Sequence, residues 1–486
     1  MMEFILKDLK RDWKLGPDLD GLMAGIVFLG MFCGAFAWGL FSDRYGRATT
    51  YLVTSLFIGI FGMLTALSHQ VWTFLVCRFF VGFGFGGSHA AFTLWQEFVP
   101  EKYRGRMLLL NQLFWTLGAL LEALLAWWIL PRWGWRNLMI ASAVLPFITA
   151  SFYIMLPESP RYLVVQNRPH EAAQVLRDVA RANGATYPEE DRLIVRYSVQ
   201  MTKTRTARRL SMPNTSAMAA EQESQQVTVE SQSDNHAGDI RELFDWYLLR
   251  TTIMLVAIWC ADTFVYYGSA FITPEFFKGS SLYTAAVITA CAEVPGIFLP
   301  MLTLDTIGRK WTLLILLGIA SMFMFIVAYI KDSTGILICL CIGRMCASSS
   351  FTVTFIYTSE IYPTSIRSTA LGTLSALSRL AGFATTYVAM NSDRLLSSTL
   401  YAVVALAAAV ASLLLKYDTK GRRMCDTVEE FRHRADEEKN QKERDEAPPL
   451  LRPGAVEEEL PPPPPPAETA PVSRVIDDSD EDSKDK

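Results

Sequence analysis

Several charged residues lie inside long apolar stretches of this sequence. They are Arg78, Glu122, Asp262, Glu293, Arg344 and Arg379. A charge at the centre of a bilayer costs about 2.5–3.5 kcal/mol or more unless it is paired or hydrated. These side chains are therefore candidates for binding a charged solute or a coupling ion, and Tyr266, close to Asp262, is a candidate for the same cavity. A structural ion pair, or packing in the case of Tyr266, is the alternative for each.

A second set of charged residues lies at the ends of the apolar stretches and occurs twice, about 260 residues apart. Asp43-Arg44-Tyr45-Gly46-Arg47 returns as Asp305-Thr306-Ile307-Gly308-Arg309, and Arg78 returns as Arg344. Glu97, Pro100 and Arg104 return as Glu360, Pro363 and Arg367, and Pro157–Arg161 has a weaker echo in Asp418–Arg422. Because the motifs recur in the same order and at nearly the same spacing, the sequence indicates two homologous halves in parallel arrangement. Among membrane proteins this is the architecture of a secondary transporter with its site between the halves.

The repeated charges could hold one state of an alternating-access cycle and separate in the other. Gly46 and Gly308 permit tight turns in the short connections. A few partly shielded ion pairs would bias the conformational equilibrium by about 1–3 kcal/mol. The alternative is that these charges only orient the chain in the membrane. The candidate gating residues are Asp43, Arg44, Gly46, Arg47, Glu97, Arg104, Glu158, Arg161, Asp305, Gly308, Arg309, Glu360 and Arg367.

The elements that position these residues are predicted to be membrane-spanning helices. Apolar residues make up 51% of the sequence and charged residues 19%. About 20 apolar residues cross a bilayer core as a helix, because only a helix satisfies its own backbone in hydrocarbon. The sequence therefore predicts an all-α polytopic membrane protein. Its eleven candidate spans are roughly 21–41, 51–68, 71–95, 107–130, 138–156, 251–272, 282–303, 311–330, 335–360, 369–390 and 396–415.

Lys and Arg gather at alternate connections, which places the motif loops, the central loop and the C-terminus in the cytoplasm. Seven of the eight cysteines fall within spans, so no disulfide framework is expected. No nucleophile–base pair or metal-ligand set stands out, which argues against an enzyme, a metal site or a cofactor. Gly82-x-Gly84-x-x-Gly87 lies within a span and not after a strand, so it does not indicate a nucleotide site. Nothing indicates a nucleic-acid partner.

The sequence divides into four segments: a transmembrane half at 1–163, a central loop at 164–248, a second transmembrane half at 249–416 and a tail at 417–486. Arg168–Gly184 is predicted to form an amphipathic helix, and the polar remainder of the loop and the charged, Pro-rich tail are typical of disorder. Repeat symmetry predicts that only the exit of the first helix, Met1 to about Leu6, is present. Either a truncated gene model or a true eleven-helix protein accounts for this. Glu446–Leu451 matches an acidic dileucine pattern that a sorting adaptor would bind.

These motifs resemble the major facilitator superfamily. Gly39-x-x-x-Asp43-Arg44-x-Gly46-Arg47 is similar to its signature between helices two and three, and Pro157-Glu158-Ser159-Pro160-Arg161 to the branch of sugar porters and organic ion transporters. Val81–Gly87, Glu97–Gly105 and Tyr357–Thr364 look closest to synaptic vesicle 2-related proteins. The resemblance implies two six-helix halves whose charged clusters close the cytoplasmic side in the outward-facing state.

The same resemblance leads us to expect Asp262 to pair with Arg344, because helices seven and ten pack at equivalent positions of the repeat. The equivalent partner of Arg78 would lie on the missing first helix, with Glu122 as a substitute. In proton-coupled sugar porters such a pair carries the coupling. His89 follows Arg78 by eleven residues, about three helical turns, and would be either a proton sensor or a hydrogen-bonded structural residue.

The sequence thus predicts a secondary transporter of a small polar or charged organic solute, an organic ion or a sugar-like molecule, with protons as the candidate coupling ion. The protein would be a monomer in the plasma membrane or in an endosomal or vesicular membrane. The alternative is a non-transporting receptor or vesicle scaffold that keeps the transporter fold, which the missing helix favours.

Overall fold

The computed structural model describes residues 2–14, 16, 19–99, 104–166, 168–185, 240–304, 306–363, 366–415, 418–419, 430, 432 and 436, with only the backbone given for 104–110, 165, 240, 275, 280, 368 and 391. Nearly all of these residues are helical. Both transmembrane halves belong to one compact unit, Met1–Phe431. The acidic dileucine pattern Glu446–Leu451, Asp305 and the side chain of Arg104 lie outside the described residues.

Two glycine-containing breaks interrupt the helices of the first half. The fourth and fifth helices together form one stretch long enough to cross a membrane, Val71–Phe98, with a break between them at Gly86-Gly87. The sixth helix is interrupted at Gly134, where φ is +75°, so it comprises two segments where we expected two spans. The helices are α1 (Met2–Trp13), α2 (Asp20–Tyr45), α3 (Arg47–Ala66), α4 (Val71–Phe85), α5 (Ser88–Phe98) and α6 (Arg104–Ser151).

The second half repeats the pattern with longer uninterrupted helices. They are α11 (Trp246–Phe276), α12 (Ser280–Thr303), α13 (Arg309–Tyr329), α14 (Ser333–Ile361), α15 (Arg367–Asn391) and α16 (Arg394–Leu414). Within the described residues, nine helical stretches are long and apolar enough to cross a membrane, and the one at Asn111–Met155 includes the break in α6. Helix α15 has 25 residues but more polar ones, and it packs between α2 and α11.

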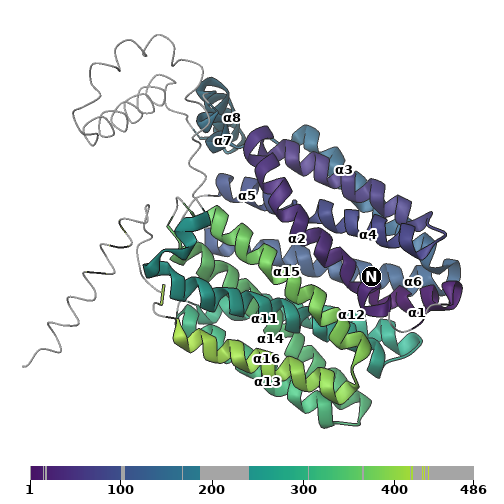
Figure 1. Ribbon diagram of the computed structural model, residues 1–486. Coiled ribbons are helices and arrows are strands. Elements are labelled where there is room, and N and C mark those ends of the chain that lie inside the picture. Colours follow the sequence, from purple (N-terminus) through teal and green to yellow (C-terminus); the bar gives the residue numbers. More distant parts are fainter. Residues whose placement is uncertain are drawn as a thin grey trace, which may run out of the picture. The chain divides into compact units, whose positions relative to one another are not determined.

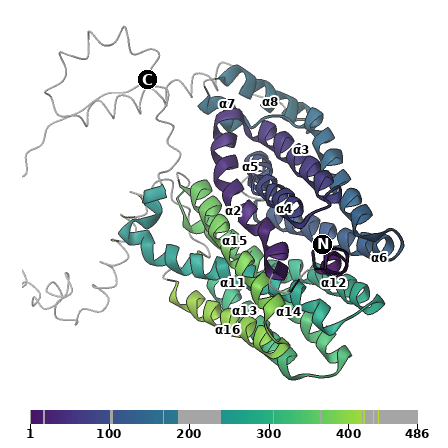
Figure 2. The same ribbon diagram turned by 45° about the vertical axis from the view of Figure 1, so that its right-hand side comes forward.

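The two halves lie side by side, with α2 of the first half against α15 of the second (Figure 1). The same neighbours remain adjacent in the rotated view (Figure 2). Thr386 on α15 donates a hydrogen bond to the backbone oxygen of Gly21 on α2 at 2.9 Å. Helix α6 contacts α12 and α14 in the same way across the other side of the interface. The space between the halves is therefore enclosed by α2, α15, α6, α12 and α14.

Two short helices, α7 (Pro160–Val165) and α8 (Pro169–Ala182), follow the first half and lie at the end of its bundle (Figure 1). Helix α8 confirms the amphipathic helix predicted for this segment, with Ala172 and Ala173 buried. Helix α1 is longer than the predicted fragment Met1–Leu6. It continues to Trp13 because Ile5, Leu6 and Leu9 form an apolar stripe that packs into the core. Two 3₁₀ turns, Phe152–Met155 and Ile240–Phe244, complete the described elements.

Candidate functional site

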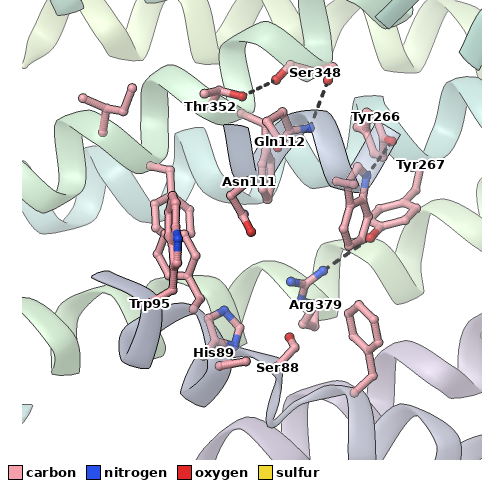
Figure 3. Close-up of a pocket in the computed structure, with 17 residues that line it drawn as sticks. Ser88, His89, Trp95, Asn111, Gln112, Tyr266, Tyr267, Ser348, Thr352 and Arg379 are labelled. Atoms are coloured by element: carbon pink, nitrogen blue, oxygen red, sulfur yellow. Dashed lines mark hydrogen bonds between the residues drawn. The ribbon is translucent and has the colours of Figure 1, made fainter. Parts of the chain in front are cut away.

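A cavity of about 430 Å³ lies between the halves, and we call it the Arg379 cavity. Figure 3 shows its polar side chains, which come from both halves: His89 and Ser88 from α5, Asn111 and Gln112 from α6, and Arg379 from α15. Its walls are largely aromatic. The aromatic residues lining it are Phe85, Phe92, Trp95, Trp115, Tyr266, Tyr267, Phe351 and Phe355.

Arg379 is the charged residue in this cavity. Its side chain is 9% exposed, and Nη1 donates a long hydrogen bond, 3.5 Å, to the hydroxyl of Tyr267. Among the described residues that line the cavity, none is a carboxylate. A guanidinium in a mainly aromatic space, faced by a phenol and not by a carboxylate, leaves donors available for an anionic group.

A second cavity of about 550 Å³, the Arg78 cavity, lies on the other side of Trp115 and Tyr266. Charges of both signs line it: Glu3, Arg78, Glu122 and Arg344. Glu122 accepts a hydrogen bond from the hydroxyl of Ser142 at 3.0 Å, and its charge acts on Arg78. We predicted Glu122 as a substitute partner for Arg78, and the two residues line the same cavity.

A hydrogen-bonded layer separates the two cavities, which share Phe85, Trp115, Tyr266 and Tyr267. Trp115 Nε1 on α6 donates to the hydroxyl of Tyr266 on α11 at 3.0 Å, and that hydroxyl donates to Glu293 at 3.2 Å. Thr116 also donates to Glu293 at 3.2 Å. Because Trp115 and Thr116 belong to the first half and the others to the second, this layer joins the halves.

Glu293 is the centre of the layer and its carboxylate is fully buried. It accepts a hydrogen bond of 2.5 Å from Arg344 Nε on α14. The expected pair of Asp262 with Arg344 is therefore wrong. Asp262 instead accepts hydrogen bonds from Ser350 at 2.6 Å and Thr354 at 2.7 Å, also on α14.

Helix geometry explains this correction. Ser350 follows Arg344 by six residues, which is about 9 Å along the helix axis at 1.5 Å per residue. Asp262 thus lies at a different depth from Arg344, although α11 and α14 are neighbours as expected. The hydroxyl pair satisfies the oxygens of Asp262, which keeps this fully buried carboxyl out of both described cavities.

The two motif loops share one geometry. Gly46 has φ +100° and Gly308 has φ +101°. In the first half, Glu158 accepts hydrogen bonds from the backbone nitrogens of Arg47 at 2.9 Å and Ala48 at 3.2 Å. In the second half, Asp418 accepts from the backbone nitrogen of Arg309 at 3.2 Å. Each carboxylate therefore satisfies free N–H groups at a helix start and interacts favourably with the helix dipole.

Ion pairs extend from these loops within each half. Arg47 lies 3.4 Å from Asp43 and 3.9 Å from Glu97. Arg309 donates two hydrogen bonds to Glu360, at 3.0 and 3.1 Å, and Thr419 donates to the same carboxylate at 2.5 Å. These contacts brace the helices of one half against each other.

The remaining gating candidates lie near these loops. Tyr162 donates a hydrogen bond to the backbone oxygen of Arg44 at 2.9 Å, and burial raises the pKa of this phenol. Arg161 is exposed, and Arg367 is half-buried at the start of α15.

Sequence reasoning missed several residues of the Arg379 cavity. Asn111 and Gln112 line it, and Gln112 Nε2 donates to the hydroxyl of Ser348 across the halves at 3.3 Å. The sequence signal that could have identified them is the occurrence of two adjacent amide side chains within the span predicted at 107–130. Trp115, which was not among the predicted site residues, lines both cavities.

Comparison with known proteins identifies the family. Residues 16–431 match the family model described as sugar (and other) transporter. The Arabidopsis thaliana organic cation/carnitine transporter 7 is 29% identical over 451 residues, covering 88% of this chain and 89% of that protein. The Xenopus laevis synaptic vesicle 2-related protein is 30% identical over 450 residues, covering 87% and 75%.

A solved structure has the same fold. The partially occluded, inward-open structure of the xylose transporter XylE from E. coli is 18% identical, with a TM-score of 0.65 over 87% of this chain and 94% of that one. The family and its relatives are transporters and not enzymes. The chain belongs to the sugar (and other) transporter family, is similar to synaptic vesicle 2-related proteins and to an organic cation/carnitine transporter, and has the fold of a major facilitator superfamily transporter.

Proposed function

We propose that this secondary transporter moves a small organic anion, coupled to protons, by alternating access. The membrane would be the plasma membrane or an endosomal or vesicular membrane. The observation that carries the proposal is Arg379, a buried cation inside a cavity between the halves. The family and its relatives support a secondary transporter, and the finer choice of an anion rests on the chemistry of this cavity.

The electrostatics of the cavity favour an anion over a cation or a neutral solute. Removing a guanidinium from water is costly unless hydrogen bonds and an opposite charge compensate. Tyr267 offers one long, uncharged acceptor. A carboxylate can accept two parallel hydrogen bonds from a guanidinium, which makes it the best complement. The volume, about 430 Å³, is in the range of small-molecule sites, and the aromatic walls would cover an apolar or aromatic body.

The contacts between the halves suggest how the solute moves. The layer of Trp115, Thr116, Tyr266 and Glu293 separates the two cavities with hydrogen bonds that cross the interface. The loop networks, in contrast, hold each half together. Rigid halves that rock about the central site would break the crossing bonds and keep the internal ones, as alternating access requires.

A sugar-like solute is the second candidate, because Asn111, Gln112 and Ser348 present hydrogen-bonding groups to the same cavity. Three probes with nearly the same shape separate an anionic, a neutral and a cationic solute: benzoate, benzamide and the benzamidinium cation. We expect benzoate alone to raise the unfolding temperature of the purified full-length protein, and labelled benzoate to enter proteoliposomes. Arg379→Gln should abolish both effects, whereas Arg181→Gln, at an exposed position on α8, should not.

Each other result contradicts the proposal in a distinct way. Stabilisation by benzamidinium, or by xylose without benzoate, would replace the anion with a cation or a sugar. Stabilisation by benzoate without uptake would favour the receptor alternative. Full benzoate binding by Arg379→Gln would remove this residue from the site.

A further inference from the structure

His89 lies beside Arg379 in the same cavity, and the transport mechanism proposed above does not use it (Figure 3). Its ring is half-buried, on the first turn of α5. Nε2 lies 2.9 Å from the hydroxyl oxygen of Ser375 on α15, and Nδ1 lies 3.4 Å from the backbone oxygen of Gly86. The side chain therefore links the first half to the second while facing the space that would hold the solute.

Both ring nitrogens of His89 face oxygen atoms that can accept a hydrogen bond. The carbonyl of Gly86 only accepts, so the Nδ1 contact requires a proton on Nδ1. In the neutral ring Nε2 then accepts from the hydroxyl of Ser375. When Nε2 is protonated, the same hydroxyl can rotate and accept instead. The ring can thus gain a proton at Nε2 without moving and without losing either partner.

Charges around His89 make its protonation depend on the solute. Arg379 is the charged group that lines the cavity together with the ring. The other titratable residues lining the cavity are the phenols of Tyr266 and Tyr267 from α11, while α6 contributes Asn111 and Gln112. From α2 and α3, Trp38 and Thr54 lie at the adjacent turn at Gly87. Among the described residues, no carboxylate lines this cavity to offset two cations.

We propose that His89 is the proton site of the transporter: it takes up one proton at Nε2 when an anion binds at Arg379, and releases it with the anion on the other side. The inference rests on the proposed function. Without an anion, an imidazolium would stand beside the guanidinium of Arg379, and like charges repel. A bound carboxylate attracts both cations and removes that repulsion. By thermodynamic linkage the proton then strengthens anion binding by the same factor as the anion strengthens proton binding.

The position of Ser375 connects this proton to the conformational cycle. The bond between His89 and Ser375 joins α5 to α15, and therefore crosses the interface that must rearrange during transport. Protonation turns this bond from one donated by the hydroxyl into one donated by the ring, which is charge-assisted and stronger. The loaded and empty carriers thus differ in a contact between the halves as well as in charge.

The test measures proton uptake on anion binding. Benzoate is added to purified full-length protein in a weakly buffered solution between pH 6 and pH 8, and proton uptake is followed with an indicator dye. Binding is measured in parallel by calorimetry. Wild-type protein should take up as much as one proton per benzoate bound, and its affinity should fall as pH rises, by up to about tenfold per pH unit.

Three variants isolate the residue. His89→Gln should bind benzoate with no proton uptake and with an affinity that does not vary with pH. Ser375→Ala removes the acceptor for the second ring proton and should reduce the uptake while Arg379 still binds the anion. His170→Gln, at an exposed position on α8, is the matched control and should behave as wild type.

The outcomes separate this inference from the proposed function. If benzoate binds wild-type protein through Arg379 but no proton is taken up, or if His89→Gln keeps the uptake, the proton site is wrong and the anion transporter stands. If benzoate does not bind wild-type protein at all, the proposed substrate class fails and the proton site fails with it.

Discussion

The turn before α3 and the turn before α13 have nearly the same backbone, whereas the two membrane arginines that the repeat makes equivalent have different environments. Gly46 and Gly308 differ by 1° in φ, at +100° and +101°, and each stands against a carboxylate. Arg344 contacts Glu293 on α12 at 2.5 Å. Arg78 shares its cavity with Glu122 on α6.

Local packing explains why the arginines diverge. Moving back from Glu293 by the repeat spacing of about 263 residues leads to Gly30 on α2. A Cβ at Gly30 would lie 2.0 Å from the backbone oxygen of Phe79 on α4. The first half therefore has no room for a carboxylate where the second half holds Glu293. The motif loops therefore keep the same turn geometry in both halves, whereas the cavity between the halves is asymmetric. The residues that would recognise the solute are those in which the two halves differ.

Breaking the pair of Glu293 and Arg344 should have the largest effect. Glu293→Leu leaves a buried guanidinium without its partner, and we expect a loss of about 3–5 kcal/mol in the free energy of unfolding. Glu122→Leu should cost less, about 1–2 kcal/mol, because Glu122 is half-buried at a cavity. Denaturant unfolding of the purified protein measures both.

The double variant Glu293→Leu/Arg344→Leu is the control for this prediction. Removing both charges should restore most of the lost stability, because no uncompensated charge then remains at this position. Equal losses for Glu293→Leu and Glu122→Leu would contradict the asymmetry between the halves.

Substitution of the two loop glycines should give smaller and nearly equal effects. A Cβ at Gly46 would lie 2.2 Å from Glu158 Oε2, and one at Gly308 would lie 2.3 Å from Asp418 Oδ2. Both glycines also have a backbone conformation that other residues rarely adopt. Gly46→Ala and Gly308→Ala should each cost about 1–3 kcal/mol, measured by the same denaturant unfolding.

Gly39→Ala is the matched control, since Gly39 belongs to the same signature motif but a Cβ added there would meet nothing within 4 Å. It lies within helix α2, so alanine should be neutral or stabilising by up to about 1 kcal/mol. A difference of more than about 1 kcal/mol between Gly46→Ala and Gly308→Ala would show that the two loops are not equivalent.

The fold could be predicted because membrane burial and duplication leave strong signals in the sequence. Long apolar stretches located the helices, and the repeated motifs gave the two halves and the loop glycines. Even the break in α6 at Gly134 was anticipated as a boundary between two spans. Helix α1 was underestimated, since repeat symmetry gave its exit but not how far Ile5 and Leu9 would carry the helix into the core.

The cavity could be predicted only in part, because charge stands out in an apolar span and neutral polarity does not. Arg379 and Tyr266 were recognised, but Asn111 and Gln112 were not, as single amides are common in helices that pack together. The partner of Arg344 was missed for another reason. The repeat identifies which helices are neighbours, but the depth of each side chain along them decides its contacts, as the hydroxyl partners of Asp262 show.

The smallest expected effect comes from the loop ion pairs, where the two halves are similar but not identical. Arg309 forms two hydrogen bonds with Glu360, at 3.0 and 3.1 Å, and Thr419 binds the same carboxylate. Arg47 lies 3.9 Å from Glu97, beyond hydrogen-bonding distance. Glu360→Gln should therefore cost about 1–2 kcal/mol and Glu97→Gln less than about 1 kcal/mol.

Double-mutant cycles with Arg309→Gln and Arg47→Gln measure these couplings directly and remove the effects of each residue on other neighbours. Raising the salt concentration should weaken the coupling of Arg47 with Glu97 more, because a longer contact leaves room for solvent and ions. If the two coupling energies prove equal, the shorter distance between Arg309 and Glu360 has no energetic consequence. A stronger coupling in the second half would instead mean that the contact of Arg309 with Glu360 holds α13 against α14 more firmly than Arg47 holds its neighbours in the first half.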